Sequence, residues 1–265
     1  MDLGLQGKKA FVAGSSKGLG LAIAMALAQE GCAVAINGRN FGRLKTAERR
    51  IREASNNAVA IVPITGDLAD PATPPAVIER AATALQGLDL LVTNTGGPPA
   101  GAFETLDDAA WENAINTLLL AHVRLIRAAL PFLRQSATPS VLTLTSYSVK
   151  QPIPNLVLSN SVRAATVNLT KTLALELARE NIRFNSILPG WTKTERVTEL
   201  LQARAQMNHS DLNTELQKQA AAIPLGRMAE PEEFAKAAVF LLSPAASYIT
   251  GVALTVEGGA YQGVC

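Results

Sequence analysis

The 265-residue sequence has few of the residues that build disulfide frameworks and metal centres. Its two cysteines, Cys32 and Cys265, lie far apart in the chain, and its two histidines, His122 and His209, are isolated from each other. Cys32 falls in an apolar strand pattern and is most simply a small core residue. We therefore expect neither a disulfide bond nor a metal site.

An excess of charge of either sign is also missing. The formal net charge is +2, only 17% of the residues are charged, and no basic run occurs. This pattern argues against nucleic acid or an acidic membrane surface as a partner. With no signal-peptide pattern and no apolar span long enough to cross a bilayer, we expect a cytoplasmic protein. The hydrophobic fraction of 48% is typical of an ordered globular chain.

Short apolar runs alternate with helix-favouring segments along the whole chain, without an evident linker or repeat. Such alternation is typical of βαβ units, and runs that are apolar throughout indicate strands covered on both faces. We predict a single α/β domain over residues 1–265, a doubly wound parallel (Rossmann) sheet of about seven strands with helices on both faces. The expected strands are residues 9–13, 33–37, 59–64, 88–93, 141–145, 182–188 and 252–256.

A glycine-rich turn follows the first expected strand. Gly14 permits a tight turn, Gly18 lets the backbone approach a pyrophosphate, and Gly20 lets the next helix pack closely. Glycine turns also join elements that bind no ligand, but this turn lies between a strand and a helix of a βαβ unit. The context therefore predicts a dinucleotide site.

The end of the second expected strand lacks a carboxylate, since no Asp or Glu occurs between Val34 and Ala47. An acidic residue at this place holds the ribose 2′-hydroxyl of NAD, whereas a 2′-phosphate requires a cation. Arg39 supplies a cation there, and Lys17 in the glycine turn supplies a second. Two solvated surface cations are the alternative interpretation, but the pattern favours NADP (NADPH) over NAD.

The segment from Ser146 to Arg163 marks the expected site of chemistry. An apolar strand delivers Ser146 to its carboxyl end, where ligands of open α/β sheets bind. A loop with Pro152 and Pro154 follows, and then a helix that carries Ser159 and Arg163.

These motifs together resemble the short-chain dehydrogenase/reductase family, in particular its β-ketoacyl-carrier-protein reductase-like members, over essentially the whole chain. The glycine turn, an Asp-Leu pair, an Asn-Thr-Gly turn, a Pro-Gly motif and the segment 227–259 are similar to family signatures. The resemblance implies a nicotinamide cofactor and a small carbonyl or secondary alcohol as substrate. It implies cofactor contacts from Gly14, Ser15, Ser16, Lys17, Gly18, Leu19, Gly20, Arg39, Asp67, Leu68, Asn94, Thr95, Gly96, Arg163, Pro189, Gly190, Thr192 and Thr194.

The catalytic positions depart from the family pattern. Members of the family use Asn, Ser, Tyr and Lys, with Tyr donating or accepting the proton and Lys holding the ribose. Ser146 matches the family serine, but Ser159 and Arg163 stand where Tyr and Lys are expected, and Leu118 stands for Asn. A serine hydroxyl is a much weaker acid than a phenol, and arginine is not equivalent to lysine.

Two further residues are candidates to compensate. Tyr147 follows Ser146 directly, although it is expected to point to the other side of the strand end, where it would serve packing. Lys150 lies on the next loop and would form, with Ser146 and Arg163, a cationic pocket for an anionic substrate or a carbonyl oxygen.

Two functions remain open on this evidence. The first is an NADP-dependent oxidoreductase with an atypical active site, and the second is an NADP-binding sensor or partner protein with little or no activity. Residues 195–222 form an amphipathic insert that corresponds to the family's helical substrate lid, although its apolar positions also fit ordinary core contacts. The resemblance further implies a homotetramer.

Overall fold

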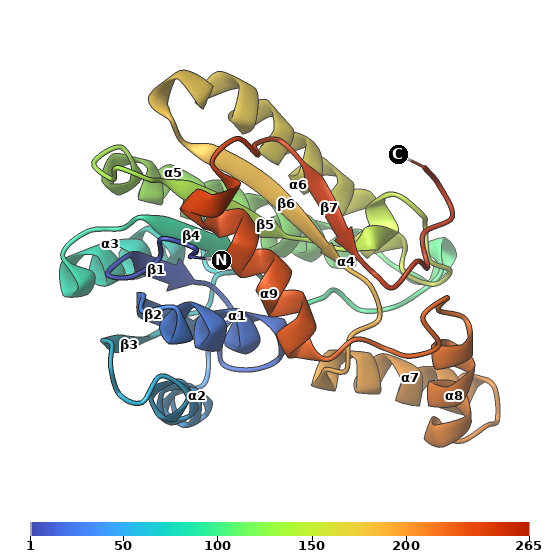
Figure 1. Ribbon diagram of the computed structural model, residues 1–265. Helices are drawn as coiled ribbons and strands as arrows, with labels where there is room; N and C mark the ends of the chain where they lie inside the picture. The colour runs from blue at the N-terminus through green and yellow to red at the C-terminus, as the bar shows by residue number, and fades with distance from the viewer. Residues whose placement is uncertain (1, 265) are drawn as a thin grey trace.

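The computed structural model describes residues 2–264, and Cys265 lies outside the described residues. All seven strands of this part pair in parallel in one sheet, in the order β3-β2-β1-β4-β5-β6-β7 (Figure 1). The strand order reverses between β1 and β4, which places the ligand-binding crevice of an open α/β sheet beside these two strands. The strands are β1 (Lys9–Val12), β2 (Ala33–Gly38), β3 (Ile61–Thr65), β4 (Leu90–Thr93), β5 (Ser140–Leu144), β6 (Arg183–Pro189) and β7 (Ala253–Val256).

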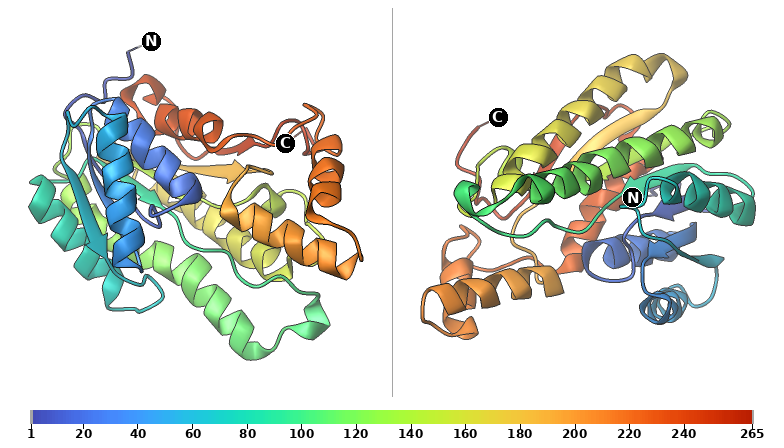
Figure 2. Two further views of the ribbon diagram at one scale, coloured as in Figure 1. Left: turned by 90° about the horizontal axis from the view of Figure 1, so that it is seen from below. Right: turned by 180° about the vertical axis from the view of Figure 1, so that it is seen from behind.

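Helices cover both faces of the sheet, as Figures 1 and 2 show. One face carries α1 (Gly18–Gln29), α2 (Phe41–Ala54) and α9 (Pro231–Leu242), and the other carries α3 (Thr73–Leu85), α5 (Ala121–Leu133) and α6 (Val157–Glu176). A helix pair, α7 (Glu195–Met207) and α8 (Leu212–Ala221), extends beyond one end of the sheet. The remaining helix is α4 (Asp108–Ile115), and short turns are η1 (Phe103–Thr105), η3 (Tyr147–Val149), η4 (Ala178–Glu180) and η5 (Pro244–Ala246).

The two-faced core explains why the strands are apolar throughout. Successive residues of a strand point to opposite faces, so Val12 packs with the cluster under α1 and α9, and Phe11 with the cluster under α3 and α5. Both residues are fully buried. The predicted doubly wound fold is therefore confirmed, with strand ends that differ by at most two residues from the expected ones.

One helix bears on the expectation that no segment crosses a membrane. The helical stretch Asp108–Leu133 is long and apolar enough, by length and composition, to cross a bilayer. The reason is that α4, the π-helical turn η2 (Asn116–Leu120) and α5 join end to end into one continuous helix. Its α5 part packs on α3 and β4, and core helices of globular proteins pass the same test, so the finding is weak evidence for a membrane span.

A single arginine ties the start of β6 to the end of α9. Arg183 donates hydrogen bonds to the carbonyls of Leu241, Leu242 and Ser243 at 2.7 to 3.0 Å, and a fourth, at 3.3 Å, to Ile249. The last carbonyls of a helix have no intrahelical partner, and a cation there also complements the helix dipole. Burial lowers the pKa of Arg183 to about 10, so the carbonyls must hold a charge removed from water.

Arg183→Met should therefore destabilise the fold, because it leaves buried helix-end carbonyls without donors. We expect a loss of about 2–4 kcal/mol in the free energy of unfolding, measured by chemical denaturation at one protein concentration. Arg134→Met removes an exposed ion pair with Glu180 and serves as the control. Equal denaturation midpoints for the two variants would contradict the role given to Arg183.

Candidate active site

The glycine turn after β1 is closed by a backbone contact that only glycine permits. A Cβ on Gly20 would lie 2.4 Å from the carbonyl oxygen of Gly14 and 2.9 Å from the amide nitrogen of Asn94. Gly14 and Gly18 adopt positive φ angles of 55° and 57°, which favour glycine. The first turn of α1 thus packs directly against the end of β1, and its free N–H groups face the crevice between β1 and β4.

The turn is fastened to β2 by Ser15 and Asn37. The Ser15 backbone N–H donates to the Asn37 carbonyl at 2.8 Å, and the Asn37 N–H donates to the Ser15 hydroxyl oxygen at 3.0 Å. The Ser15 hydroxyl in turn donates to the carbonyl of Val12. The Asn37 side chain donates to the carbonyls of Ile64 and Gly66, which adds β3. Three strand ends therefore share one hydrogen-bond network beneath the turn.

The expected adenosine end of the site lies at the ends of β2 and β3. Arg39 and Asp67 are exposed, and their charged groups are 4.0 Å apart. Leu68 is buried beside them, and Gly38 lies so close to Ser16 that a Cβ would come within 2.9 Å of the serine Cβ. The structure thus brings together the residues predicted for the 2′-phosphate and the adenine, with no carboxylate between β2 and α2.

The end of β4 supplies the next segment of the crevice. The Asn94 side chain donates to the carbonyls of Ala13 and Gly14, and so joins the ends of β1 and β4. The Thr95 hydroxyl is buried and has no hydrogen-bond partner in the described protein. Gly96 has nothing within 4 Å of the place where a Cβ would lie.

The loop after β6 closes the crevice from the opposite side. Gly190 leaves no room for a side chain, since a Cβ would lie 2.5 Å from the Cβ of Glu257. Thr192 is buried, and its hydroxyl has no partner in the part of the chain that the structure describes. Thr194 caps α7 by accepting a hydrogen bond from the Val197 N–H, and its methyl group lies 3.7 Å from the Cβ position of Gly18.

Lys17 links the glycine turn to this helix. Its ammonium group is 2.6 Å from the Glu195 carboxylate and 3.8 Å from that of Glu199. The predicted cation in the turn is therefore paired with α7, which holds the helix pair α7–α8 against the turn.

The residues around the crevice fit a dinucleotide. Thr95 and Thr192 present buried hydroxyls that have no hydrogen-bond partner among residues 2–264, although buried polar groups are normally hydrogen-bonded. Both hydroxyls lie at the carboxyl edge of the sheet. The N-terminus of α1 lies between these hydroxyls and the adenosine end of the site at Arg39. A nicotinamide dinucleotide would use them as donors or acceptors, as the family resemblance implies for Thr192.

The catalytic candidates meet at the end of β5. Ser146 lies two residues after the end of β5 and caps η3, accepting a hydrogen bond from the Ser148 N–H at 3.2 Å. Ser159 and Arg163, four residues apart on α6, are both buried at 8% and 7% exposure. Arg163 reaches the same strand end, donating to the Leu144 carbonyl at 3.4 Å. The structure thus brings Arg163 to the strand end that carries Ser146.

A chain of hydroxyl groups fixes α6 on the sheet. Thr143 on β5 lies 2.8 Å from the Thr170 hydroxyl and 2.7 Å from that of Ser186 on β6. One turn earlier, the Thr166 hydroxyl donates to the Leu118 carbonyl, which belongs to the π-helical turn η2. π-Helical turns widen the helix locally and are frequent at functional sites. The face of α6 that carries Arg163 is thereby held in one position.

Tyr147 has a packing role in this structure. Its side chain is buried, and its hydroxyl accepts a hydrogen bond from the indole N–H of Trp191 at 3.1 Å. Burial raises the pKa of the Tyr147 phenol, the Glu257 charge raises it further, and only the Trp191 hydrogen bond opposes them. A phenol with a raised pKa is a poor proton donor near neutral pH.

The Lys150 side chain has no contact with Ser146, Ser159 or Arg163 among the interactions of the described residues. It is exposed, and its ammonium group stands 5.5 Å from the centre of the Tyr261 ring. The Lys150 ammonium group therefore lies beside the C-terminal segment, whereas the Arg163 side chain lies inside the site.

Sequence reasoning missed His122, which is fully buried one helical turn after Leu118. Its Nδ1 atom is 2.8 Å from the Thr93 hydroxyl at the end of β4. Burial and the nearby Arg163 charge lower the pKa of His122 to about 3, so the ring is neutral at physiological pH. No local pattern distinguishes such a residue, because its surroundings depend on β4 and α6. The described residues contain no cluster of His, Cys, Asp and Glu suited to a metal ion.

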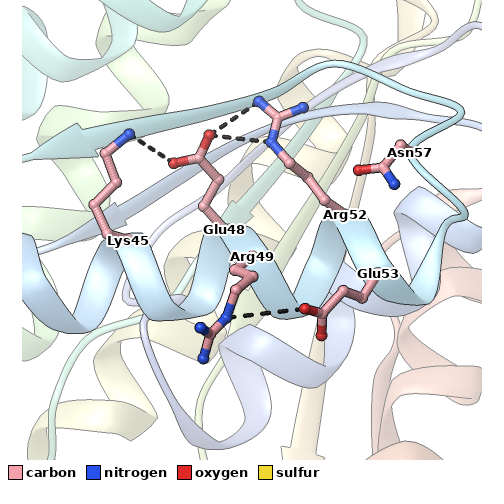
Figure 3. A pocket seen from close by; sticks show the side chains of 6 residues that line it. All are labelled: Lys45, Glu48, Arg49, Arg52, Glu53 and Asn57. Atoms are coloured by element: carbon pink, nitrogen blue, oxygen red, sulfur yellow. Dashed lines mark hydrogen bonds and ion pairs between the residues drawn. The ribbon is translucent and has the colours of Figure 1, made fainter.

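A second hollow lies far from these strand ends, on the outer side of α2 (Figure 3). Glu48 pairs with Lys45 and Arg52, and Arg49 pairs with Glu53. Pairs three and four residues apart are usual on exposed helix faces. Every charged side chain that lines the hollow therefore has an ion-pair partner within α2.

The close contact at Gly20 gives a direct test of the crevice. Gly20→Ala should weaken NADPH binding at least tenfold and lower the melting temperature, because the added methyl group meets the Gly14 carbonyl. Fluorescence titration and thermal unfolding measure the two effects. Gly42→Ala on α2 is the matched control, since its nearest neighbour is a side-chain oxygen at 3.4 Å. Wild-type affinity in Gly20→Ala would contradict the assignment.

Known proteins match the chain over nearly its full length. The family model for enoyl-(acyl carrier protein) reductase matches residues 13–261. The NADPH-dependent reductase BacG of Bacillus subtilis is 28% identical, with 97% of this chain and 99% of that protein covered. The crystal structure of L-sorbose reductase from Gluconobacter frateurii, complexed with NADPH and L-sorbose, is 34% identical, covers 100% of both chains and has a TM-score of 0.94.

A third match has an unusual site. An NADPH-bound short-chain oxidoreductase from Pseudomonas aeruginosa PAO1, described as containing an atypical catalytic centre, is 30% identical with a TM-score of 0.88. It covers 97% of this chain and 98% of its own. The NADP prediction agrees with these relatives, and membership of an oxidoreductase family favours the enzyme over the sensor. The chain belongs to the short-chain dehydrogenase/reductase family.

Proposed function

We propose that the protein is an NADPH-dependent oxidoreductase that reduces a carbonyl compound, or oxidises the corresponding secondary alcohol, at an atypical active site. The observation that carries this proposal is the convergence of Ser146 and Arg163 at the end of β5, beside a crevice lined by unsatisfied hydroxyls. NADPH in related structures and in an NADPH-dependent relative supports the cofactor.

The cofactor is proposed to lie along the carboxyl edge of the sheet. Arg39 would bind the 2′-phosphate, Asp67 the adenine, and the N–H groups at the start of α1 the pyrophosphate. Thr192 would hold the carboxamide, and Arg163 would hold the ribose of the nicotinamide through its several N–H donors. When bound, NADPH supplies the hydride that forms the new C–H bond at the carbonyl carbon.

The protein's task is then to stabilise the charge that develops on the substrate oxygen. The Ser146 hydroxyl would donate a hydrogen bond to this oxygen, and the fixed cation of Arg163 would stabilise the negative charge electrostatically. The proton that completes the alcohol would pass from water through the Ser159 hydroxyl, since serine alone is too weak an acid to be its source. In this arrangement, the Arg163 cation and the hydroxyls of Ser146 and Ser159 take the place of the tyrosine that family members use as the acid.

The helix pair α7–α8 would form the substrate lid. Leu201 and Ala205 of α7 are buried, and Leu201 packs in a small cluster with Ile223 and Met228. The salt bridge from Lys17 to Glu195 holds this pair against the glycine turn. The substrate, as in a 3-oxoacyl-carrier-protein reductase-like reaction, would bind between this lid and the end of β5.

Removing the Ser146 hydroxyl tests its proposed role in binding the substrate oxygen. Ser146→Ala should lower kcat by about 10²-fold or more, with NADPH affinity unchanged, because its hydrogen bond strengthens as charge develops. A panel of ketones and aldehydes, followed by NADPH oxidation, measures the effect. Tyr147→Phe is the control and should change kcat by less than about threefold. Tight NADPH binding without turnover of any carbonyl by the wild type would support the sensor instead.

Restoring the family residues gives a second test. The double variant Ser159→Tyr with Arg163→Lys should lose activity relative to the wild type, because it replaces the permanently charged guanidinium by an ammonium with fewer N–H donors and fills the site with a phenol. Steady-state kinetics and a pH profile measure the change. A gain of activity would identify the wild type as a dormant scaffold and would refute this mechanism.

We also propose a homotetramer. Leu175 on the outer side of α6 and Leu254 on the edge strand β7 are exposed in the single chain, as expected for surfaces covered by other copies. Sedimentation equilibrium should give four chains per particle. A monomer at micromolar concentration would refute the assembly.

A further inference from the structure

Lys17 in the glycine turn is held by carboxylates of the helix α7. Its ammonium group donates a hydrogen bond to Glu195 at 2.6 Å and lies 3.8 Å from the Glu199 carboxylate. Glu195 and Glu199 are four residues apart, so both extend from one face of α7 toward the turn. One cation of the expected cofactor site is therefore paired with two anions of the helix pair α7–α8.

The backbone places this ion pair beside the start of α1. Lys17 is the N-cap residue of α1, and its extended backbone leads directly into the first turn, whose N–H groups have no intrahelical partner. A Cβ on the next residue, Gly18, would lie 3.7 Å from the methyl group of Thr194, which precedes Glu195. A phosphate held by these N–H groups would thus lie next to the residue that carries the ammonium group.

The same turn also contacts the end of β2, where the 2′-phosphate is expected. A Cβ on Gly38 would lie 2.9 Å from the Cβ of Ser16, so these two backbones touch. Arg39 follows Gly38, and Lys17 follows Ser16, so a cation comes directly after this contact in both segments. The adenosine end of the site and the ion pair of Lys17 therefore belong to one region of the crevice.

The Glu195 carboxylate responds to cations from two elements. The hydrogen bond from Lys17 lowers the pKa of Glu195 most, the charges of Lys17 and Arg43 lower it further, and burial opposes them. Arg43 lies in the first turn of α2, which begins just after Arg39. A carboxylate in this position carries the same sign of charge as a phosphate and is bound by the same kind of donor.

We propose that Glu195 and Glu199 compete with a phosphate of NADPH for Lys17, so that two lid residues set the affinity for the cofactor. The inference rests on the proposed binding of NADPH and extends it to the lid. A competing partner within the protein lowers the apparent affinity by the fraction of molecules in which Lys17 is occupied. Because coupling is reciprocal, NADPH would also release this tie between α7 and the turn.

Removing the stronger competitor tests the proposal. Glu195→Gln should strengthen NADPH binding about three- to fivefold at low ionic strength, measured by fluorescence titration, because exposed ion pairs contribute modestly. Glu53→Gln is the matched control, since it removes an exposed carboxylate that pairs with Arg49 on the outer side of α2. It should change the dissociation constant by less than about 1.5-fold. An unchanged or weaker affinity in Glu195→Gln would overturn the proposal.

A double-mutant cycle separates competition from simple repulsion between the carboxylate and the cofactor phosphates. In a Lys17→Met background, Glu195→Gln should change the dissociation constant by less than about 1.5-fold, because the cation for which both anions compete is gone. The same strengthening in both backgrounds would mean repulsion alone and would eliminate the role given to Lys17.

NADH identifies the phosphate, because it has the pyrophosphate but lacks the 2′-phosphate. If Glu195→Gln strengthens the binding of NADPH alone, Lys17 serves the 2′-phosphate, and if it strengthens both cofactors equally, Lys17 serves the pyrophosphate. Either result supports the competition.

These titrations need no turnover, so they separate the inference from the proposed function. If the wild type binds NADPH and Glu195→Gln binds it no more tightly, the inference fails and the function stands. If neither protein binds NADPH, both are overturned.

Discussion

The site depends on the contact between the first turn of α1 and the end of β1. Gly20 packs on the Gly14 carbonyl with no room for a methyl group, and this contact points the free N–H groups of α1 into the crevice. The hydrogen bonds of Ser15 and Asn37 then fix the ends of β2 and β3 to this turn. Because each partner lies on a different strand, the position of the turn is set by the whole amino-terminal half of the sheet.

The fold and the cofactor crevice could be predicted well from the sequence because their signals are local. Apolar runs predict strands, and Gly14, Gly18 and Gly20 between a strand and a helix predict a binding turn wherever the rest of the chain goes. Strand ends moved by a residue or two because pairing with neighbours decides them. The continuous helix Asp108–Leu133 contains the π-helical turn η2, and no local pattern in the sequence marks that turn.

The chemistry of the site is less local, and sequence reasoning reached it only in part. Ser159 and Arg163 were located by their spacing on one helix face, and the structure places both inside the protein. Lys150 was proposed for the substrate pocket because it is near Ser146 in the chain, whereas the structure places its ammonium group against the Tyr261 ring. Likewise, nothing adjacent to His122 or Arg183 indicates their partners, which are contributed by other elements.

The replaced positions are mutually consistent, which argues against simple decay of an ordinary site. Leu118 has no polar side chain, yet its carbonyl in the π-helical turn accepts a hydrogen bond from Thr166. Thr166 lies three residues after Arg163 and seven after Ser159, so one face of α6 carries all three residues. A neutral His122 beside them adds no competing charge. The Arg163 cation is held at the end of β5 by the Leu144 carbonyl, and a cation so placed is useful to a reaction that develops negative charge on oxygen.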